Sequence, residues 1–359
     1  MKNITIGGRE VGEGQPVFII AEVSANHRGK IETALSAIDA AAEAGADAVK
    51  FQHLTGTTIA ADIPIDTLWN GKPVGTLSAF YAKSELPYEW TPQLVARAKE
   101  RNIIFLSTPF DHEAVEVLDE AGVPAFKVAS YELTDDILLR YIAKKGKPII
   151  ISTGMAYLDE VKHAVEVIRQ AGNEQIAEQI AVLHCVSLYP PQPEDLNLKA
   201  IETMRRELAL PIGYSDHSAP SSNAATLGAV ALGACIIERH ITDSQEGGSN
   251  DDKNSMTVAQ FKAMVAEVRF LSSALSGSGV KAPVVAPDRA TDEMSERGTR
   301  RSLYAACEIK AGETLTEDMV LTLRPMRGIE PKDLQTIVGK KASRAIPARS
   351  PITKEDIAV

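Results

Sequence analysis

Two lysines occupy positions where a charge is expensive. Lys50 lies inside the apolar run AVKFQ (48–52), and Lys127 lies inside AFKVAS (125–130). A lysine within a buried strand costs free energy unless its ammonium group is paired or binds a ligand, although a lysine stem can also extend along an apolar surface toward solvent. We favour ligand binding, because hydroxyl groups stand at the ends of similar runs, in Thr108, Ser130, Ser152 and Ser215. Together these groups have the chemistry that holds a phosphate and a carboxylate.

Two histidines close consecutive apolar runs. His217 follows PIGYSD (211–216), and His240 ends CIIERH (235–240). Two neutral imidazoles can hold one divalent metal and leave coordination positions open for water and substrate. A hydrogen-bonded pair of histidines without a metal fits the same spacing, so the residues alone leave both interpretations open.

A carboxylate lies near the end of another run. Glu22 is the fifth residue of FIIAEV (18–23). A carboxylate at the end of a buried strand is costly unless it takes part in chemistry or is paired. Glu22 is therefore expected to be a general base or the partner of a lysine, and we favour the base.

These residues need a scaffold that brings strand ends together. Amphipathic patterns such as 30–45 and 158–172, each ended by a glycine, indicate helices between most of the β-rich runs. Alternating apolar strands and helices indicate a parallel sheet, and eight such units predict a (β/α)8 barrel. The expected strands are 18–23, 48–52, 103–110, 125–130, 148–154, 181–186, 211–216 and 235–240.

A doubly wound sheet is the alternative architecture. It would usually carry a glycine-rich phosphate-binding turn after its first strand, but here that turn is VSANHRG. In a barrel, the C-terminal strand ends form a single active-site face. The barrel therefore predicts that the lysines, hydroxyls, histidines and Glu22 share one pocket.

The remaining segments do not follow the alternation of strands and helices. Residues 53–90 form a long insertion, expected to be a lid or rim on the catalytic face. The glycines of GGREVG (7–12) indicate a hairpin turn rather than a phosphate loop. Beyond the barrel domain (1–270), small residues and prolines predict a linker over 271–295, and short strand patterns predict a β-rich module over 296–359.

The composition limits the classes of partner. The 359 residues are 44% hydrophobic and 24% charged, which is typical of a soluble globular protein. The net charge of −10 weighs against nucleic acid and anionic membrane as partners. The N-terminus lacks the apolar core of a secretory signal, and no apolar run is long enough to span a membrane. Three widely spaced cysteines predict reduced thiols and a cytoplasmic location.

A series of motifs over about 18–256 resembles the sialic acid synthase family. In order they are AEVSANHRG, AGADAVKFQ, LSTPFD, AFKVASYE, KPIIISTGM, HCVSLYP, GYSDHS and ALGACIIERHIT. The later stretch GTRRSLYAACEIKAGETLTEDMVLTLRPMRGI resembles the antifreeze-like (SAF) module that these synthases carry at the C-terminus. The resemblance implies a (β/α)8 TIM barrel followed by a small β-rich SAF domain. It also implies a domain-swapped homodimer in which each module caps the partner's active site.

The resemblance further implies an activity and residue roles. The family condenses phosphoenolpyruvate with an open-chain amino-sugar aldehyde to give a nine-carbon 2-keto acid. The implied cofactor is a divalent metal, Mn²⁺ first, with Mg²⁺ or Co²⁺ as alternatives. By resemblance, His217 and His240 bind this metal and Glu22 is the acid/base. Phosphoenolpyruvate is held by Lys50, Thr108, Lys127, Ser130, Ser152 and Ser215, and the sugar is contacted by Gln52, Glu132, Tyr189, Asp251 and Arg324.

Departures from the N-acetylneuraminate-type pattern indicate the substrate. Ser187 replaces an asparagine, and Ser249-Asn250-Asp251 replaces Gly-Pro-Asp. The lid residues Trp69, Tyr81 and Tyr88-Glu89-Trp90 resemble those of pseudaminic acid synthases, as do Asp252-Lys253-Asn254-Ser255 and QFKAMVAEVR (260–269). The expected sugar is therefore a 2,4-diacetamido-2,4,6-trideoxy hexose. Legionaminic and N-acetylneuraminic acid synthases are the alternatives.

A non-catalytic carbohydrate-binding protein is a remote alternative from another class. Such a protein could have lost the base or a metal ligand without penalty. Here the base, the lysines and the histidines are all present, namely Glu22, Lys50, Lys127, His217 and His240. This set favours an enzyme, a distinction that fold alone could not make.

Overall fold

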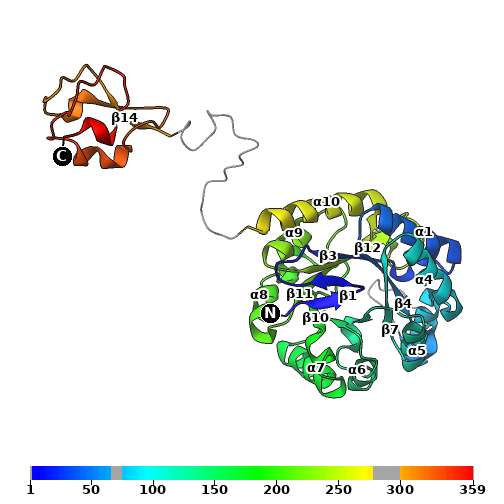
Figure 1. Ribbon diagram of the computed structural model, residues 1–359. Helices are drawn as coiled ribbons and strands as arrows, with labels where there is room; N and C mark the ends of the chain where they lie inside the picture. Colours follow the sequence, from blue (N-terminus) through cyan, green and yellow to red (C-terminus); the bar gives the residue numbers. More distant parts are fainter. Residues whose placement is uncertain (1, 66–74, 278–299, 359) are drawn as a thin grey trace. The chain divides into compact units, whose positions relative to one another are not determined.

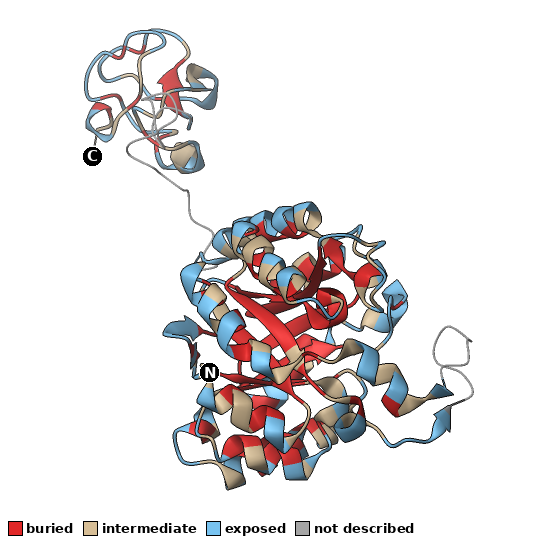
Figure 2. Ribbon diagram, turned by 90° about the vertical axis from the view of Figure 1, so that its right-hand side faces the viewer, coloured by how far each residue is buried: buried red, intermediate tan, exposed pale blue. Residues whose placement is uncertain are grey.

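Eight parallel strands form the centre of the N-terminal unit. Their β-branched and aromatic residues are buried almost throughout, as Figure 2 shows by the red strands inside the partly exposed helices. In the computed structural model, residues 2–65, 75–277 and 300–358 are described. The strands are β3 (Phe18–Glu22), β4 (Ala48–His53), β7 (Ile104–Pro109), β8 (Phe126–Val128), β9 (Ile149–Ser152), β10 (Ile180–Cys185), β11 (Ile212–Asp216) and β12 (Ile236–Thr242).

The strands close into a nearly complete barrel. Their order is β7-β4-β3-β12-β11-β10-β9-β8, and β7 and β8 at the two ends of this path lie against each other. The predicted (β/α)8 barrel is therefore confirmed, and the doubly wound alternative is wrong. A short β13 (Met256–Thr257) extends the pairing beside β12.

Helices surround the strands (Figure 1). Each buries an apolar face against the barrel, and polar caps fix where several begin; the Asp111 carboxylate, for example, accepts a hydrogen bond from the Ala114 amide at 2.7 Å. The helices that follow the barrel strands are α1 (Ile31–Glu43), α4 (Thr91–Glu100), α5 (His112–Glu120), α6 (Asp136–Ala143), α7 (Leu158–Ala171), α8 (Ala200–Leu208), α9 (Ala224–Ala231) and α10 (Val258–Leu275).

An N-terminal hairpin closes one end of the barrel. β1 (Ile4–Ile6) pairs antiparallel with β2 (Arg9–Val11), as the sequence predicts. Gly7 and Gly8 form the turn with φ values of +56° and +82°, which glycine adopts at little cost. Ile4, Ile6 and Val11 pack with interior strand residues in one apolar cluster, so this end of the barrel is filled. Polar strand residues are consequently left for the opposite, C-terminal end.

The register aligns these polar residues. Glu22 lies beside His240 on one neighbouring strand and beside Lys50 on the other. Ser215 similarly lies beside Glu238. Because all eight strands are parallel, their C-terminal ends face the same side and place these groups around one opening.

The insertion after β4 is a set of short elements. These are α2 (Gly56–Ile59), β5 (Pro64–Ile65), β6 (Gly75–Thr76), α3 (Leu77–Tyr81) and 3-10 turns at Ala82–Ser84 and Tyr88–Trp90. Trp69, on which part of the substrate prediction depends, lies outside the described residues. His53 anchors the insertion, because its Nδ1 lies 2.7 Å from Ser107 Oγ and its Nε2 2.7 Å from Thr91 Oγ1.

The last barrel helix runs further than predicted. α10 continues to Leu275, into the segment expected to be a linker from residue 271. Leu271 packs on the barrel core, and Ser272 Oγ accepts a hydrogen bond from the Val17 amide at 3.3 Å. These tertiary contacts stabilise the helix despite its small residues. The rest of the expected linker, from 278, lies outside the described residues.

The C-terminal unit has its own small core, formed by residues such as Leu303, Ile309, Leu315 and Ile352. β14 (Ser302–Ala305) pairs with β15 (Val320–Leu323), and 3-10 turns occupy Glu317–Met319, Pro331–Thr336 and Lys354–Asp356. The strand predicted over 302–309 ends early because the chain turns outward at Cys307 and Glu308, after which Ile309 forms an isolated bridge with Ile346. Among the residues described in both units, no helix is long and apolar enough to cross a membrane.

Candidate active site

A cavity of about 410 Å³ opens at the C-terminal ends of the barrel strands. This volume lies within the usual range for small-molecule sites. Of the residues predicted to form a site, all but Thr108 and Arg324 line this cavity. The structure therefore brings together groups that the sequence scatters over more than 200 positions.

A second cavity of about 440 Å³ lies at the opposite end of the barrel. Its two cationic side chains are already paired, Arg205 with Glu13 and Arg269 with Asp47. The strand ends beside it, such as Ile212 and Cys235, contribute apolar groups. Of these two cavities, the C-terminal one has more polar and charged side chains available to a ligand.

Two lysines and two carboxylates form the floor of the C-terminal cavity. Lys50 Nζ lies 2.7 Å from Glu22 Oε2 and 3.7 Å from Glu238 Oε1. Lys127 Nζ lies 3.9 Å from Glu238 Oε2. All four side chains are at least 94% buried, so their charges interact with little screening by water. The floor is close to neutral when no ligand is bound.

Burial and pairing displace the pKa values of this group. Burial, opposed by Lys50, raises the pKa of Glu22 to about 7. Burial favours a neutral Glu238, but Lys127 and Lys50 lower its pKa overall. Burial lowers the pKa of Lys127, whereas Glu22 and Glu238 outweigh burial at Lys50 and raise its pKa. Glu22 can therefore exist in both protonation states near neutral pH, as an acid/base requires.

Hydroxyl groups extend this floor. Ser152 Oγ accepts a hydrogen bond from Lys127 at 2.5 Å, and Ser215 Oγ donates to Glu238 Oε1 at 3.1 Å. Ser130 Oγ accepts from the Gly154 amide at 2.9 Å. Thr108 does not reach the cavity wall; its hydroxyl accepts from Lys50 Nζ at 3.2 Å, so it lies behind the lysine.

The rings of His217 and His240 lie next to each other, as the order of their strands predicts. Their ring centroids are 5.5 Å apart. His217 Nδ1 donates to the Val186 carbonyl at 2.8 Å, which directs Nε2 toward the Tyr189 hydroxyl at 3.2 Å. His240 Nδ1 is buried without a hydrogen-bond partner among the described residues. An imidazole nitrogen in that state is suited to bind a metal ion.

The protonation of the two imidazoles differs. Burial lowers the pKa of His240 to about 4, so this ring is neutral and ready to coordinate. Burial also disfavours a charge on His217, but Cys185 and the Val186 carbonyl beside it raise its pKa to about 9. A cation bound here would have to displace the His217 proton. The described residues contain no cluster of three or more ligating side chains, so two imidazoles would leave several positions open.

The residues expected to contact the sugar lie on the cavity wall. Gln52 Nε2 donates to Glu22 Oε1 at 2.8 Å, and the Tyr189 ring stacks on His217 with centroids 4.1 Å apart. Burial raises the pKa of Glu132 to about 7, and its Oε2 has no hydrogen-bond partner in the part of the chain described. Asp251 reaches the cavity from the loop after β12. Arg324 belongs to the C-terminal unit, where it follows β15 and is exposed.

One wall of the cavity is apolar. Leu54, Ile59, Leu77 and Phe80 line it, all from the end of β4 and the insertion that follows. The sequence predicted a lid here without indicating its chemistry. The apolar wall and the charged floor give the cavity two different sides.

Sequence reasoning assigned no role to several groups in the cavity. Glu238 is the most important, because it contacts both lysines. Its signal was present, since a carboxylate inside the apolar run CIIERH carries the same burial cost that singled out the lysines. Other unassigned residues on the wall are Ser24, Cys185, Ser187, Asn250 and Asn254.

Comparisons with known proteins identify the family of each unit. Residues 37–281 match the NeuB family and residues 300–358 match the SAF domain. The chain is 38% identical to a pseudaminic acid synthase of Campylobacter jejuni, covering 92% of this chain and 93% of that protein. It is 36% identical to an N,N'-diacetyllegionaminic acid synthase of the same species, covering 91% and 96%. A crystal structure of N-acetylneuraminic acid (sialic acid) synthetase from Leptospira borgpetersenii superimposes with a TM-score of 0.69 at 34% identity, covering 79% of this chain and 93% of that one.

Proposed function

Because the chain belongs to the NeuB family and is a carbon–carbon bond-forming enzyme of the phosphoenolpyruvate-dependent nonulosonic acid synthase class, we propose that it is a pseudaminic acid synthase. The reaction joins phosphoenolpyruvate, a 2,4-diacetamido-2,4,6-trideoxy hexose and water to give a nine-carbon nonulosonic acid and phosphate. The observation that carries this proposal is the buried floor of two lysines and two carboxylates beside paired imidazoles.

Phosphoenolpyruvate binds to the cationic part of the floor. Lys50 and Lys127 supply charge for its phosphate and carboxylate groups, and Ser130, Ser152 and Ser215 supply neutral hydrogen-bonding groups. Thr108 acts through Lys50, which it orients. Glu238 lies 3.7 Å from Lys50 and 3.9 Å from Lys127, so both lysine charges are compensated before an anion binds.

The chain's proton-transfer group is Glu22. Carbon 3 of phosphoenolpyruvate bonds to the aldehyde carbon, and the aldehyde oxygen gains a proton to become a hydroxyl. Water adds to carbon 2 and gives up one proton. The hydroxyl that results becomes the keto group when the bond from carbon 2 to the bridging oxygen breaks, and its remaining proton passes to the leaving phosphate. Glu22, with a pKa of about 7 and Lys50 at 2.7 Å, can both donate and accept these protons.

The two imidazoles fit a divalent metal. His240 presents a buried nitrogen that has no hydrogen-bond partner within the described ranges, and the Nε2 of His217 faces the same region. A bound Mn²⁺, with Mg²⁺ or Co²⁺ as alternatives, supplies Lewis-acid polarisation of the aldehyde oxygen. The chain's own contribution is to hold the ion between two strand ends and leave its other positions open.

The apolar wall favours a deoxy sugar. A sugar hydroxyl placed against Leu77 or Phe80 would lose water without gaining a partner, at a cost of roughly 1–3 kcal/mol. A methyl group at the same position would instead gain burial. The wall therefore supports a 2,4,6-trideoxy substrate over N-acetylmannosamine.

Phosphate release from phosphoenolpyruvate tests the function. The enzyme is incubated with Mn²⁺, phosphoenolpyruvate and, separately, the amino-sugar precursors of pseudaminic, legionaminic and N-acetylneuraminic acids. We expect release with the pseudaminic precursor above the other two, and none with phosphoenolpyruvate alone. A preference for another sugar would show that the proposed substrate is wrong. No phosphate release with any of the three sugars would favour a carbohydrate-binding protein.

Assembly and location follow the same proposal. The protein forms a domain-swapped homodimer in which the C-terminal unit of one chain completes the partner's site through Arg324. The small core of that unit supports docking on a larger surface. A cytoplasmic location is supported by the three free cysteines.

A further inference from the structure

The turn after β3 is strained at both ends. Ser24 has φ +48° and Arg28 has φ +51°, and neither is a glycine. A non-glycine residue in this backbone region is strained, so tertiary contacts must hold it there. Both residues make such contacts with the loop that follows β12. Ser24 Oγ donates to Asp251 Oδ2 at 2.6 Å, and Arg28 binds the next residue, Asp252.

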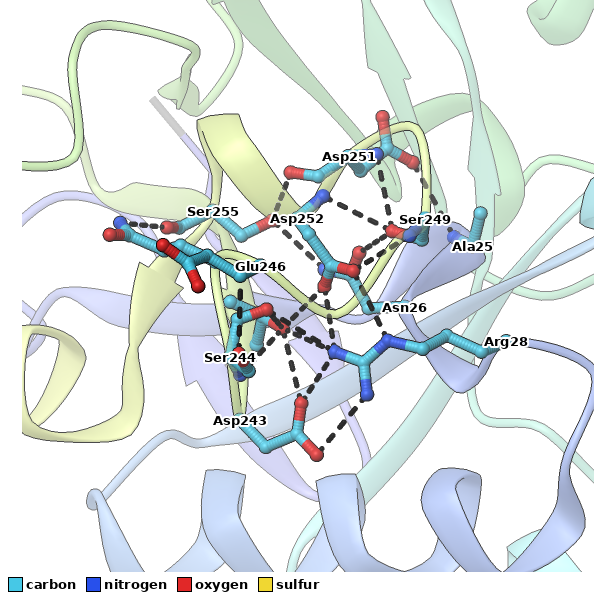
Figure 3. Close-up of polar contacts among 12 residues, drawn as sticks. Ala25, Asn26, Arg28, Asp243, Ser244, Glu246, Ser249, Asp251, Asp252 and Ser255 are labelled. Atoms are coloured by element: carbon cyan, nitrogen blue, oxygen red, sulfur yellow. Dashed lines mark hydrogen bonds and ion pairs between the residues drawn. The ribbon is translucent and has the colours of Figure 1, made fainter.

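Arg28 binds two carboxylates, each through two hydrogen bonds. Nε and Nη2 donate to Asp252 at 3.1 and 2.9 Å. Nη2 and Nη1 donate to Asp243 at 2.6 and 3.3 Å. Figure 3 shows the guanidinium between these two side chains, with the loop wrapped around it. Hydrogen bonds from Arg28 lower the pKa of Asp243, and at Asp252 they help to outweigh burial, so both carboxylates stay ionised.

The loop is packed tightly onto this guanidinium. A Cβ added to Gly247 would lie 2.0 Å from Arg28 Nη2, so a larger residue there would have to displace the guanidinium. Asp252 is 1% exposed and also accepts hydrogen bonds from the Thr242 hydroxyl at 2.6 Å and the Ser249 amide at 2.8 Å. The guanidinium is therefore packed against the loop, with 20% of the Arg28 side chain left exposed.

Two consecutive carboxylates face different surroundings as a result. Asp252 is held by Arg28, whereas Asp251 lines the catalytic cavity. Because they are adjacent in the chain, fixing the backbone at Asp252 also fixes where Asp251 projects. Ser24, at the other end of the strained turn, binds Asp251 directly.

We propose that Arg28 is a positioning residue: by clamping Asp252 and Asp243 it holds Asp251 in the orientation that binds the amino sugar. Arg28 itself does not line the cavity. The proposal rests on the proposed function for the identity of the ligand as an amino sugar. It assigns Arg28 no part in binding phosphoenolpyruvate, whose groups lie on the lysine floor.

The test compares Arg28→Met with Arg97→Met. Arg97 makes the same two-bond contact with Asp39 at 2.8 and 2.7 Å, but on the outer helices α4 and α1, so it controls for the loss of an ion pair. We expect Arg28→Met to raise KM for the amino sugar by roughly 10- to 100-fold, the effect of a misplacement of about 1 Å, and to leave KM for phosphoenolpyruvate unchanged. Arg28→Lys keeps the charge but lacks the forked guanidinium, so its KM for the amino sugar should lie between the values of wild type and Arg28→Met. Arg97→Met should have the wild-type KM.

The same substitution made in an Asp251→Asn enzyme distinguishes the positioning of Asp251 from a general structural role of Arg28. In an Asp251→Asn enzyme, Arg28→Met should add little to KM for the sugar, because the group that it positions has already been altered. An equal effect in both backgrounds, an equal rise in both KM values, or no rise would each overturn the proposal. Where Asp251→Asn is too slow for kinetics, the sugar's Kd from calorimetry gives the same comparison.

Hydrogen exchange tests whether Arg28 holds the loop through Asp252 and Asp243, a contact called the clamp below, without any measurement of activity. The amides of Ser249, Asp251 and Asp252 are hydrogen-bonded within the loop. In Arg28→Met the peptide covering 244–255 should exchange faster than in wild type, and in Arg97→Met it should not. Unchanged exchange would refute the clamp. An inactive wild type with faster exchange in Arg28→Met would count against the proposed function and leave the clamp supported.

Discussion

At the scale of single residues, the site is a set of buried charges that satisfy one another before a ligand arrives. Lys50 and Lys127 are each close to Glu238, and Lys50 is also paired with Glu22. Removing one member of such a group leaves another charge uncompensated. Lys127 gives the cleaner test of anion binding, because its nearest carboxylate oxygen lies at 3.9 Å rather than 2.7 Å.

Replacing Lys127 with Met keeps the apolar stem and removes the charge. The affinity for phosphoenolpyruvate should fall by roughly 2–3 kcal/mol, or about 30- to 160-fold in Kd, as measured by calorimetry. Lys147→Met serves as the control, since Lys147 pairs with Asp119 outside the cavity. An unchanged Kd for Lys127→Met would mean that this lysine is structural.

Removal of the metal should abolish turnover. Within the described residues only His217 and His240 offer imidazoles to the cavity, so the ion is held by few protein ligands and should be extractable. We expect EDTA-treated enzyme to be inactive and added Mn²⁺ to restore phosphate release. Full activity of the metal-stripped enzyme in excess EDTA would contradict this role.

The burial-cost argument predicted the lysines and Glu22 from sequence, since each interrupts an apolar run. It did not predict which charges pair, because pairing depends on the register of β3 with its neighbours β4 and β12. Thr108 shows the same limit, as its run is correct but its hydroxyl points to Lys50 behind the wall. Arg28 carried no sequence signal, because its partners Asp243 and Asp252 lie more than 200 residues away.

At the scale of elements, the lid is fixed to the barrel through a buried imidazole. His53, at the end of β4, lies within 2.7 Å of Ser107 and Thr91 hydroxyls and stacks on Tyr88 with ring centroids 5.3 Å apart. Burial lowers its pKa from about 6.5 to about 3, so the folded protein holds it neutral. This neutral imidazole therefore makes the stability of the lid region depend on pH.

The sign of this dependence follows from the two pKa values. Below pH 6.5 the unfolded chain binds a proton that the folded state excludes until about pH 3, so stability falls as the pH falls through this window. At pH 5 the loss from His53 is about 2 kcal/mol. In His53→Gln the difference in unfolding free energy from wild type should shrink by about that amount between pH 7.5 and pH 5.

Urea denaturation at the two pH values measures this effect. His163→Gln is the matched control, since His163 is an exposed histidine on α7. A difference between wild type and His53→Gln that does not change with pH would show that His53 is not held neutral.

The elements themselves were largely predictable. Hydrophobic runs located all eight strands, because a strand buried on both faces has an almost continuous apolar sequence. The ends of helices and strands were less predictable where tertiary contacts determine them, as in the continuation of α10 to Leu275. The early end of β14 at Ala305 has the same origin, because the local pattern SLYAACEI carries no sign of the turn at Cys307.

At the scale of the whole molecule, the C-terminal unit is expected to complete a site in trans. A mixed dimer tests this with Arg324→Ala in one chain and Glu22→Ala in the other, each inactive alone. If the unit docks on the partner, one site carries both defects and the other is intact, so mixing restores up to about half of the activity per mixed dimer by site counting. If it docks on its own chain, every site has one defect and subunits that demonstrably exchange recover nothing.

Formation of the new carbon–carbon bond is the most direct test of the central claim that the barrel's strand ends condense phosphoenolpyruvate with an aldehyde. Phosphoenolpyruvate labelled with ¹³C at carbon 3 and the trideoxy amino sugar labelled at carbon 1 are incubated with the enzyme and Mn²⁺, and the product is examined by NMR. We expect a one-bond ¹³C–¹³C coupling in the product, appearing together with free phosphate. Phosphate released without that coupling would mean that the enzyme hydrolyses phosphoenolpyruvate instead of condensing it with the sugar.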